Sequence, residues 1–99
     1  MVVHIVMWRV ADTDEAGRAA AVGEIRSMLE ALPGLVPGIR GLEVGVNALP
    51  GDNAADVVLT TRFDDWNALG AYGVHPEHVR VAKRMGELAS ERRSVDYEV

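Results

Sequence analysis

The sequence predicts an α+β fold in which strands and helical regions follow one another as strand–helix–strand–strand–helix–strand. Four short segments carry the β-branched residues or the alternation of apolar and polar side chains that is typical of strands: residues 2–10, 39–48, 56–63 and 94–99. Between the first and second segments, and again before the fourth, apolar residues recur every three or four positions, as in amphipathic helices. Ninety-nine residues suit one compact unit, so we expect a single domain over residues 1–99.

Composition excludes several kinds of function. The formal net charge of −5 argues against binding to nucleic-acid phosphates or to an anionic membrane surface. The sequence has no cysteine, which excludes disulfides, thiol nucleophiles and thiolate metal sites. The apolar start of the chain is about half as long as a membrane-spanning helix and lacks the basic residues of a signal peptide. We therefore expect a cytoplasmic protein without nucleic-acid or membrane partners.

The first predicted strand, residues 2–10, is apolar on both of its faces. A strand of this kind is covered on both sides. Alternation places His4 and Trp8 on one face. The other face carries an apolar row made of Val3, Ile5 and Met7.

A helix is predicted to follow, ending near Ala31. Asp12 and Glu15 have the spacing of a capping box, and Asp14 adds negative charge where the helix dipole favours it. The dipeptide Pro33-Gly34 is expected to end this helix. Its predicted buried stripe consists of Ala21, Val22, Ile25, Met28, Leu29 and Leu32.

The middle of the chain is predicted to form a hairpin from residues 39–48 and 56–63. The connecting residues 49–55 include the sequence Pro-Gly-Asp-Asn, which is typical of turns. The last predicted strand, residues 94–99, alternates apolar with acidic side chains: Val95, Tyr97 and Val99 against Asp96 and Glu98.

The second helical region is predicted to be interrupted at His75-Pro76. A short helix over residues 65–71 is followed by a longer one that begins at Pro76, because proline at the first helical position needs no N–H partner and already has a helical φ. His75 is then the N-cap or its neighbour. His78 lies in the first turn, on the face that should meet the core. That face is predicted to contain His78, Ala82, Met85 and Ala89.

This order of elements is that of a ferredoxin-like fold, β-α-β-β-α-β, in which the helices cover one face of a four-stranded antiparallel sheet. The helices cannot cover the opposite face, although the first strand is apolar there. The simplest cover is the same face of a second copy. We therefore expect a homodimer.

Tyr72 and His78 are the first candidates for a functional site. An imidazole near neutral pH can accept a proton from carbon beside a carbonyl, and a tyrosine hydroxyl can donate a hydrogen bond to the resulting enolate. The same two residues could instead be ordinary core residues with satisfied polar atoms. A catalytic pair of this kind would need no cofactor.

A metal site at His75 and His78 is a further alternative. His75 precedes a proline and is expected to lie outside the helix, so the two rings need not converge. Glu77 should point away from them and would not complete a ligand set. We therefore assign no metal ligands.

Several segments resemble the stress-responsive dimeric A/B barrel family, Dabb, over nearly the whole chain. They are HIVMWRV, PGIRGLEVGVN, VVLTTRFDDWNAL, VDYEV and, most specifically, YGVHPEH at residues 72–78. The resemblance implies a ferredoxin-like fold that dimerises into an α/β barrel.

The resemblance also implies roles for individual residues. One family member is a polyketide cyclase that closes a ring by intramolecular aldol condensation, and its catalytic Tyr and His match Tyr72 and His78. His4 would line the same cavity. The further candidate substrate-binding residues are Trp8, Val57 and His75.

Several functions remain open at this point. One is a polyketide cyclase-like lyase or isomerase that acts on a β-keto substrate. Another is a non-catalytic, stress-related dimer that binds a small apolar ligand, or only itself. The third is a cofactor-free oxygenase, which small ferredoxin-like dimers of a neighbouring family exemplify, although YGVHPEH favours Dabb.

Overall fold

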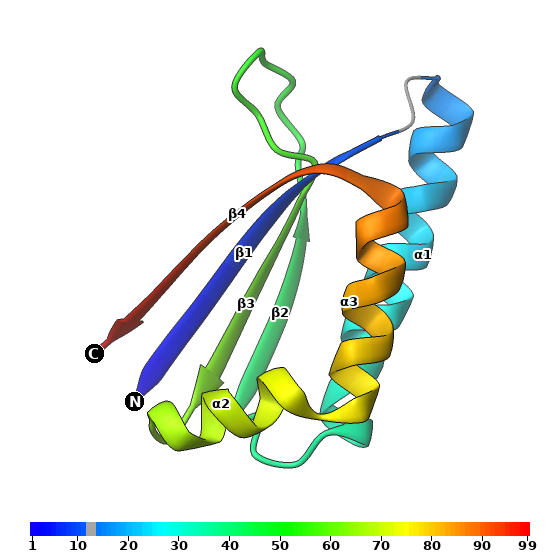
Figure 1. The fold of residues 1–99 in the computed structure, drawn as a ribbon. Coiled ribbons are helices and arrows are strands. Elements are labelled where there is room, and N and C mark those ends of the chain that lie inside the picture. Colours follow the sequence, from blue (N-terminus) through cyan, green and yellow to red (C-terminus); the bar gives the residue numbers. More distant parts are fainter. Residues whose placement is uncertain (12–13) are drawn as a thin grey trace.

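The computed structural model describes residues 1–11 and 14–99 of the chain (Figure 1). Its elements confirm the predicted ferredoxin-like fold, with the second helical region divided in two. In chain order they are β1 (Val2–Val10), α1 (Glu15–Leu35), β2 (Gly41–Val46), β3 (Val57–Phe63), α2 (Trp66–Val74), α3 (Pro76–Leu88) and β4 (Ala89–Glu98).

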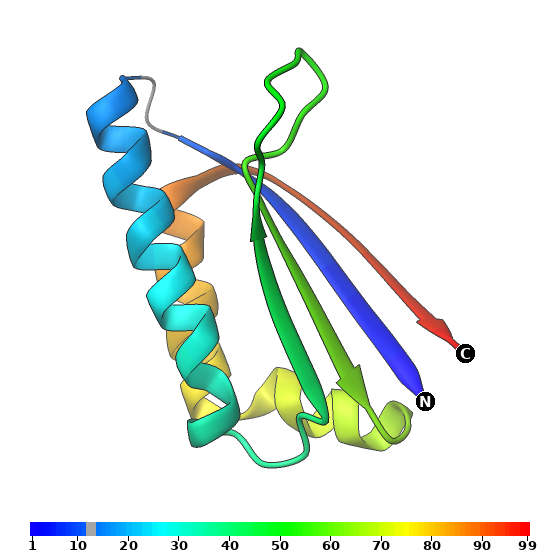
Figure 2. The same cartoon turned by 180° about the vertical axis from the view of Figure 1, so that it is seen from behind.

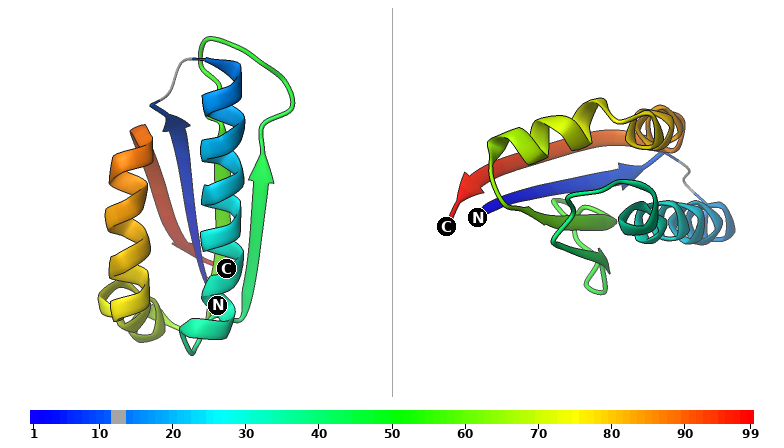
Figure 3. Two further views of the ribbon diagram at one scale, coloured as in Figure 1. Left: turned by 90° about the vertical axis from the view of Figure 1, so that its right-hand side faces the viewer. Right: turned by 90° about the horizontal axis from the view of Figure 1, so that it is seen from below.

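The four strands form one antiparallel sheet in the order β2-β3-β1-β4. Helices α1 and α3 run side by side along one face of the sheet, and α2 crosses its lower end (Figures 1 and 3). An ion pair between Arg84 and Glu24, with Nη2 and Oε1 2.9 Å apart, joins α3 to α1. Within the described residues, no element covers the opposite face of the sheet, as the view from behind also shows (Figure 2).

Strand β1 lies in the middle of the sheet and separates a packed face from an open one. Its helix-facing side chains, including Val6 and Trp8, are buried in the core. On the opposite face, three apolar side chains remain 41–53% exposed: Met7, Val95 and Tyr97. A single copy of the chain therefore leaves an apolar sheet face in contact with water.

Helix α1 is longer than predicted, because it continues through Pro33 to Leu35. Proline removes one backbone donor, but beyond it Val36 is 2% exposed and its amide donates to the Leu32 carbonyl at 2.8 Å. Burial of Val36 in the core offsets the loss of one hydrogen bond. At the other end, the Asp14 side chain accepts a hydrogen bond from the Gly17 amide at 2.6 Å and is the N-cap. The predicted role of Asp12 lies outside the described residues.

Strand β4 begins at Ala89, five residues before the predicted start at Ser94. Residues 90–94 are all polar or charged, which is typical of a loop in a sequence. They form a strand because the backbone pairs with β1, residues 91–94 opposite residues 6–9, at the edge of the sheet, where polar side chains meet water. Strand β2, by contrast, is shorter than predicted. The predicted residues that lie outside it are Ile39, Arg40, Asn47 and Ala48.

The break between α2 and α3 falls where the sequence predicts it. His75 caps α3, and its Nδ1 accepts a hydrogen bond from the Glu77 amide at 3.1 Å. The buried stripe of α3 differs from the prediction: Val81 and Met85 are buried, whereas Ala82 is exposed because it faces a cavity. None of the described helices is both long enough and apolar enough to span a membrane.

Candidate functional site

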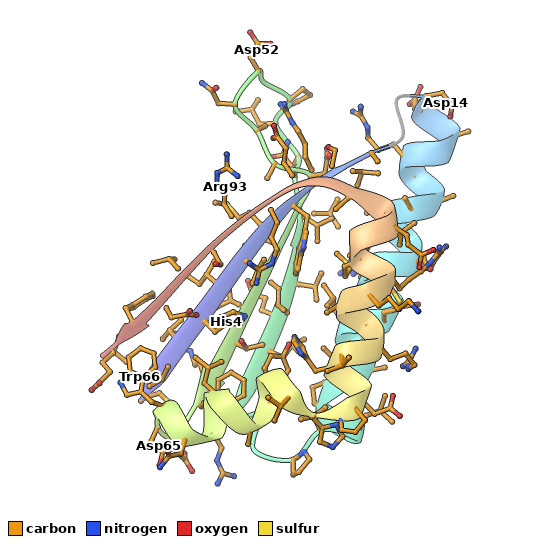
Figure 4. The ribbon with its side chains drawn as sticks, viewed as in Figure 1. His4, Asp14, Asp52, Asp65, Trp66 and Arg93 are labelled. Atoms are coloured by element: carbon orange, nitrogen blue, oxygen red, sulfur yellow. The ribbon has the colours of Figure 1, made fainter. Side chains whose placement is uncertain are left out.

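A cavity of about 380 Å³ lies between the sheet and α3. Its walls come from several elements: β1 contributes His4 and Trp8, α2 contributes Tyr72, α3 contributes His78 and Met85, and β4 contributes Arg92. Figure 4 shows His4 on the part of β1 that looks toward the helices. Four of the residues singled out from the sequence, His4, Trp8, Tyr72 and His78, thus meet around one space.

Tyr72 lies between the two histidines. Its ring centroid is 4.3 Å from that of His78 and 6.2 Å from that of His4. Phe63 packs against it, with 5.1 Å between the ring centroids. The residue is 2% exposed, so packing sets the orientation of its ring.

His78 has a defined hydrogen-bonding state. Its Nδ1 lies 3.0 Å from the backbone carbonyl oxygen of Gly73, at the end of α2. A carbonyl only accepts, so Nδ1 carries a hydrogen and, in the neutral ring, Nε2 keeps its lone pair. Burial is the main cause of a lowered pKa for His78; the Gly73 carbonyl opposes it, and the charges of His4 and Arg92 add to it. The ring is therefore neutral near pH 7 and can accept a proton.

Tyr72 is a donor where His78 is an acceptor. Burial raises its pKa to about 12, against a smaller lowering by the positive charge of Arg92, so the phenol stays protonated at neutral pH. Among the described residues, no group accepts a hydrogen bond from the Tyr72 hydroxyl. If this oxygen were fully buried, it would be a buried polar atom without a partner, and the described residues contain none. The hydroxyl is therefore accessible from the cavity and can donate to a ligand there.

His4 is oriented by Asp96, a residue that sequence reasoning did not connect with it. The two lie opposite each other in the pairing of β1 with β4, and His4 Nδ1 contacts an Asp96 carboxylate oxygen. A carboxylate oxygen accepts, which assigns a hydrogen to Nδ1, and in the neutral ring Nε2 then keeps its lone pair. Alternation places Asp96 on one face of its strand, but only the register of β4 against β1 reveals its partner.

Two other candidate residues are not part of the cavity wall. His75 is occupied as the cap of α3, and Val57 packs in the core. Helix α1 contributes Leu29 to the wall. In the part of the chain that the structure describes, no three His, Cys, Asp or Glu side chains are grouped to hold a metal ion.

Arg92 is a cavity residue that the sequence did not suggest. It stands opposite Trp8 in the pairing of β4 with β1, and so faces the helices. Because residues 90–94 were not predicted to be a strand, no alternation pattern assigned Arg92 to a face.

Comparison with known proteins identifies the family. The sequence profile of the stress responsive A/B barrel domain, Dabb, matches residues 2–99. The chain belongs to the Dabb family. The resemblance of HIVMWRV, YGVHPEH and VDYEV is thereby confirmed as family membership. This Dabb chain is also 29% identical, over 102 residues, to the Arabidopsis thaliana stress-response A/B barrel domain-containing protein DABB1. The match covers 98% of this chain and 46% of the plant protein, so the chain spans less than half of that relative.

Solved structures show the same fold. A dimeric protein of unknown function and ferredoxin-like fold from Bacteroides fragilis is 33% identical, with a TM-score of 0.88 and coverage of 99% of this Dabb chain and 95% of that one. A hydroxynitrile lyase from Passiflora edulis is 14% identical, with a TM-score of 0.83 and coverage of 99% and 92%. At that identity the second likeness concerns the fold alone.

Proposed function

We propose that this Dabb protein binds a small carbonyl compound in the cavity and catalyses cofactor-free abstraction of a proton next to the carbonyl. Aldol cyclisation or isomerisation of a polyketide-like β-keto substrate would follow from this step. One observation carries the proposal: His78, a neutral base with a lone pair on Nε2, and Tyr72, a donor that is protonated at neutral pH, lie against each other on one cavity wall, with their ring centroids 4.3 Å apart.

The reaction requires only a proton and an electron pair to move. His78 Nε2 takes the proton from a carbon flanked by two carbonyls, and the C–H electrons pass to a carbonyl oxygen as an enolate. Tyr72 donates a hydrogen bond to that oxygen as the negative charge develops. In an aldol cyclisation, the enolate carbon attacks a second carbonyl of the same molecule, and the His78 imidazolium returns its proton to the new alkoxide. In an isomerisation, the proton returns to a different atom of the enolate.

His4 would assist without taking the proton. Its Nδ1 is engaged by Asp96, so its Nε2 is an acceptor directed by a carboxylate. In the proposed complex, this nitrogen accepts a hydrogen bond from a substrate hydroxyl or enol. The apolar surfaces of Trp8 and Met85 would hold the rest of the ligand.

We also propose that the functional form is a homodimer. The open sheet face exposes Met7, Val95 and Tyr97, which a second copy would cover. The Bacteroides fragilis relative, at 33% identity, is described as dimeric.

A non-catalytic ligand-binding role is the rival. The cavity is walled mostly by apolar side chains, which suits retention of a ring or acyl chain without reaction. Both roles predict binding, and only one predicts turnover, so the test has to measure the two separately.

Deuterium incorporation at the α-carbon of ethyl benzoylacetate, followed by proton NMR in deuterated buffer, tests the catalytic role. The wild-type protein should accelerate incorporation, and His78→Ala or Tyr72→Phe should reduce the acceleration about a hundredfold or more. His75→Asn is the matched control, because it removes a histidine outside the cavity wall and keeps a good N-cap. Equal rates for wild type and His78→Ala, with the ester still bound, would contradict catalysis and leave the ligand-binding role.

The same Tyr72→Phe variant reports on the hydroxyl's role in folding. Its free energy of unfolding should lie within about 0.5 kcal/mol of the wild-type value, because the hydroxyl has no protein partner to lose. Urea denaturation measures this. A loss of about 1 kcal/mol or more would mean that the hydroxyl is a bonded core group instead.

A further inference from the structure

The positive charge of the cavity is concentrated in one side chain. Arg92 is the only Lys or Arg among the described residues that line the cavity. Its guanidinium Nη1 makes one long hydrogen bond, 3.4 Å to the Ser94 hydroxyl. This contact leaves most of its five N–H donors to water or to a ligand.

The nearby carboxylates do not neutralise Arg92. Asp96 is engaged by His4. Glu91 borders the cavity beside Arg92, but its carboxylate pairs with Arg9 at 3.9 Å. Within residues 1–11 and 14–99, no carboxylate lies within ion-pair distance of Arg92. The chain as a whole is acidic, with a net charge of −5, so an unpaired cation at the cavity is a local exception.

The field of Arg92 reaches the proposed reacting groups. Burial is the main cause of the pKa shifts of both His78 and Tyr72, and the charge of Arg92 contributes to each by lowering it. The backbone of Arg92 is level with Trp8, and its side chain runs along β4 to Ser94, which is level with Val6. The guanidinium therefore lies on the cavity wall, on the face of β4 that also carries Asp96, the partner of His4.

We propose that Arg92 binds a carboxylate of the ligand, so that the cavity takes a carbonyl compound that also carries a carboxylate, with an apolar ring or chain between the two groups. This inference rests on the proposed small-molecule role of the cavity but not on its catalytic activity. A single planar guanidinium matches a carboxylate through two parallel hydrogen bonds. A phosphate, with up to two negative charges, would be better served by several cations, and the wall offers one.

Binding of naphthalene-2-carboxylate, compared with the neutral naphthalene-2-carboxamide, tests the proposal by isothermal titration calorimetry at pH 7.5 and low salt. The two probes have the same ring and nearly the same shape, and differ in charge. The wild type should bind the carboxylate about tenfold or more tightly, as expected for a charge-assisted hydrogen-bonded pair. In Arg92→Gln, binding of the carboxylate should weaken to the level of the carboxamide, so that both probes bind equally. Arg92→Lys should keep part of the preference, because lysine retains the positive charge but cannot form the two parallel hydrogen bonds of a guanidinium.

Arg93→Gln is the matched control, since it removes the same charge from the next residue, which faces the opposite side of β4 (Figure 4). It should retain the full preference for the carboxylate. Circular dichroism checks that each variant is folded, and Arg92 is exposed, so its replacement should not disturb packing.

Three results would overturn the proposal: equal binding of the two probes by wild type, no binding of either up to millimolar concentration, or loss of preference in Arg93→Gln as well. Tighter binding of 2-naphthyl phosphate, also lost in Arg92→Gln, would overturn the assignment to a carboxylate in favour of a phosphate. Failure of the deuterium-exchange test leaves these binding results unaffected, so the two proposals fail separately.

Discussion

At the scale of single residues, burial acts on His78 and Tyr72 with opposite signs. It lowers the pKa of the imidazole and raises that of the phenol to about 12, because in each case the charged form is the one that loses hydration. The result is two neutral groups side by side at pH 7, one with a lone pair and the other with a hydrogen. Neither side chain of this acid–base pair has to be charged before it reacts.

The lowered pKa of His78 predicts how stability depends on pH. The folded-state pKa lies below the unfolded value of about 6.5, so the unfolded chain binds the proton more readily. The contribution of His78 is fully present above the unfolded pKa, declines as pH falls through the interval between the two values, and levels off below the folded pKa. Urea unfolding between pH 8 and pH 5 should show this loss.

The variant His78→Gln isolates that effect, because it keeps a polar side chain without the titrating group. Its unfolding free energy should fall less than that of wild type over the same pH range. An NMR titration that placed the pKa of His78 at or above the unfolded-state value of about 6.5 would refute the assignment of a buried, neutral ring.

At the scale of elements, α1 and the turn after it illustrate how backbone conformation decides the effect of one methyl group. Gly23 lies in the middle of α1 and a Cβ there would meet open space, whereas Gly38 has φ of +92° in the turn before β2. Left-handed backbone is costly for a residue with a Cβ, while alanine in a helix is favoured over glycine.

Gly23→Ala should therefore raise the free energy of unfolding by about 0.5–1 kcal/mol, and Gly38→Ala should lower it by about 1 kcal/mol or more. Each variant adds the same methyl group, so the pair serves as its own control. Denaturation of both at one protein concentration measures the difference. Changes of the same sign would show that the turn conformation around Gly38 is wrong.

At the scale of the whole molecule, the uncovered sheet face determines the expected assembly. We predict that light scattering at micromolar concentration gives a particle of twice the 10.7 kDa chain mass. Val95→Glu should shift it toward a single chain, because a charge would be buried at the contact. Val79→Glu, on the surface of α3, is the control, since Val79 and Val95 are both 53% exposed. A wild-type mass of one chain would rule out the homodimer.

Several features follow from the sequence alone because they depend on local periodicity and local backbone chemistry. The order of elements, the common face of His4 and Trp8, and the break at His75-Pro76 are of this kind. Each reflects alternation along a strand or the conformational limits of proline, which act over a few residues. The resemblance to Dabb, most specific in YGVHPEH, also came from the sequence, and the family profile over residues 2–99 confirmed it.

The tertiary structure decided which distant residues share the cavity. Asp96 meets His4, and Arg92 joins the wall, through the register of β4 against β1, which pairs residues about 80 to 96 positions apart. The polar run at 90–94 has no apolar pattern that would reveal a strand, so only backbone pairing at the sheet edge makes it one. Likewise, α1 runs through Pro33 because Val36 beyond it is buried in the core and bonds back to Leu32, which offsets the local cost of the proline. Strand register and burial are properties of the assembled core, so local sequence does not determine them.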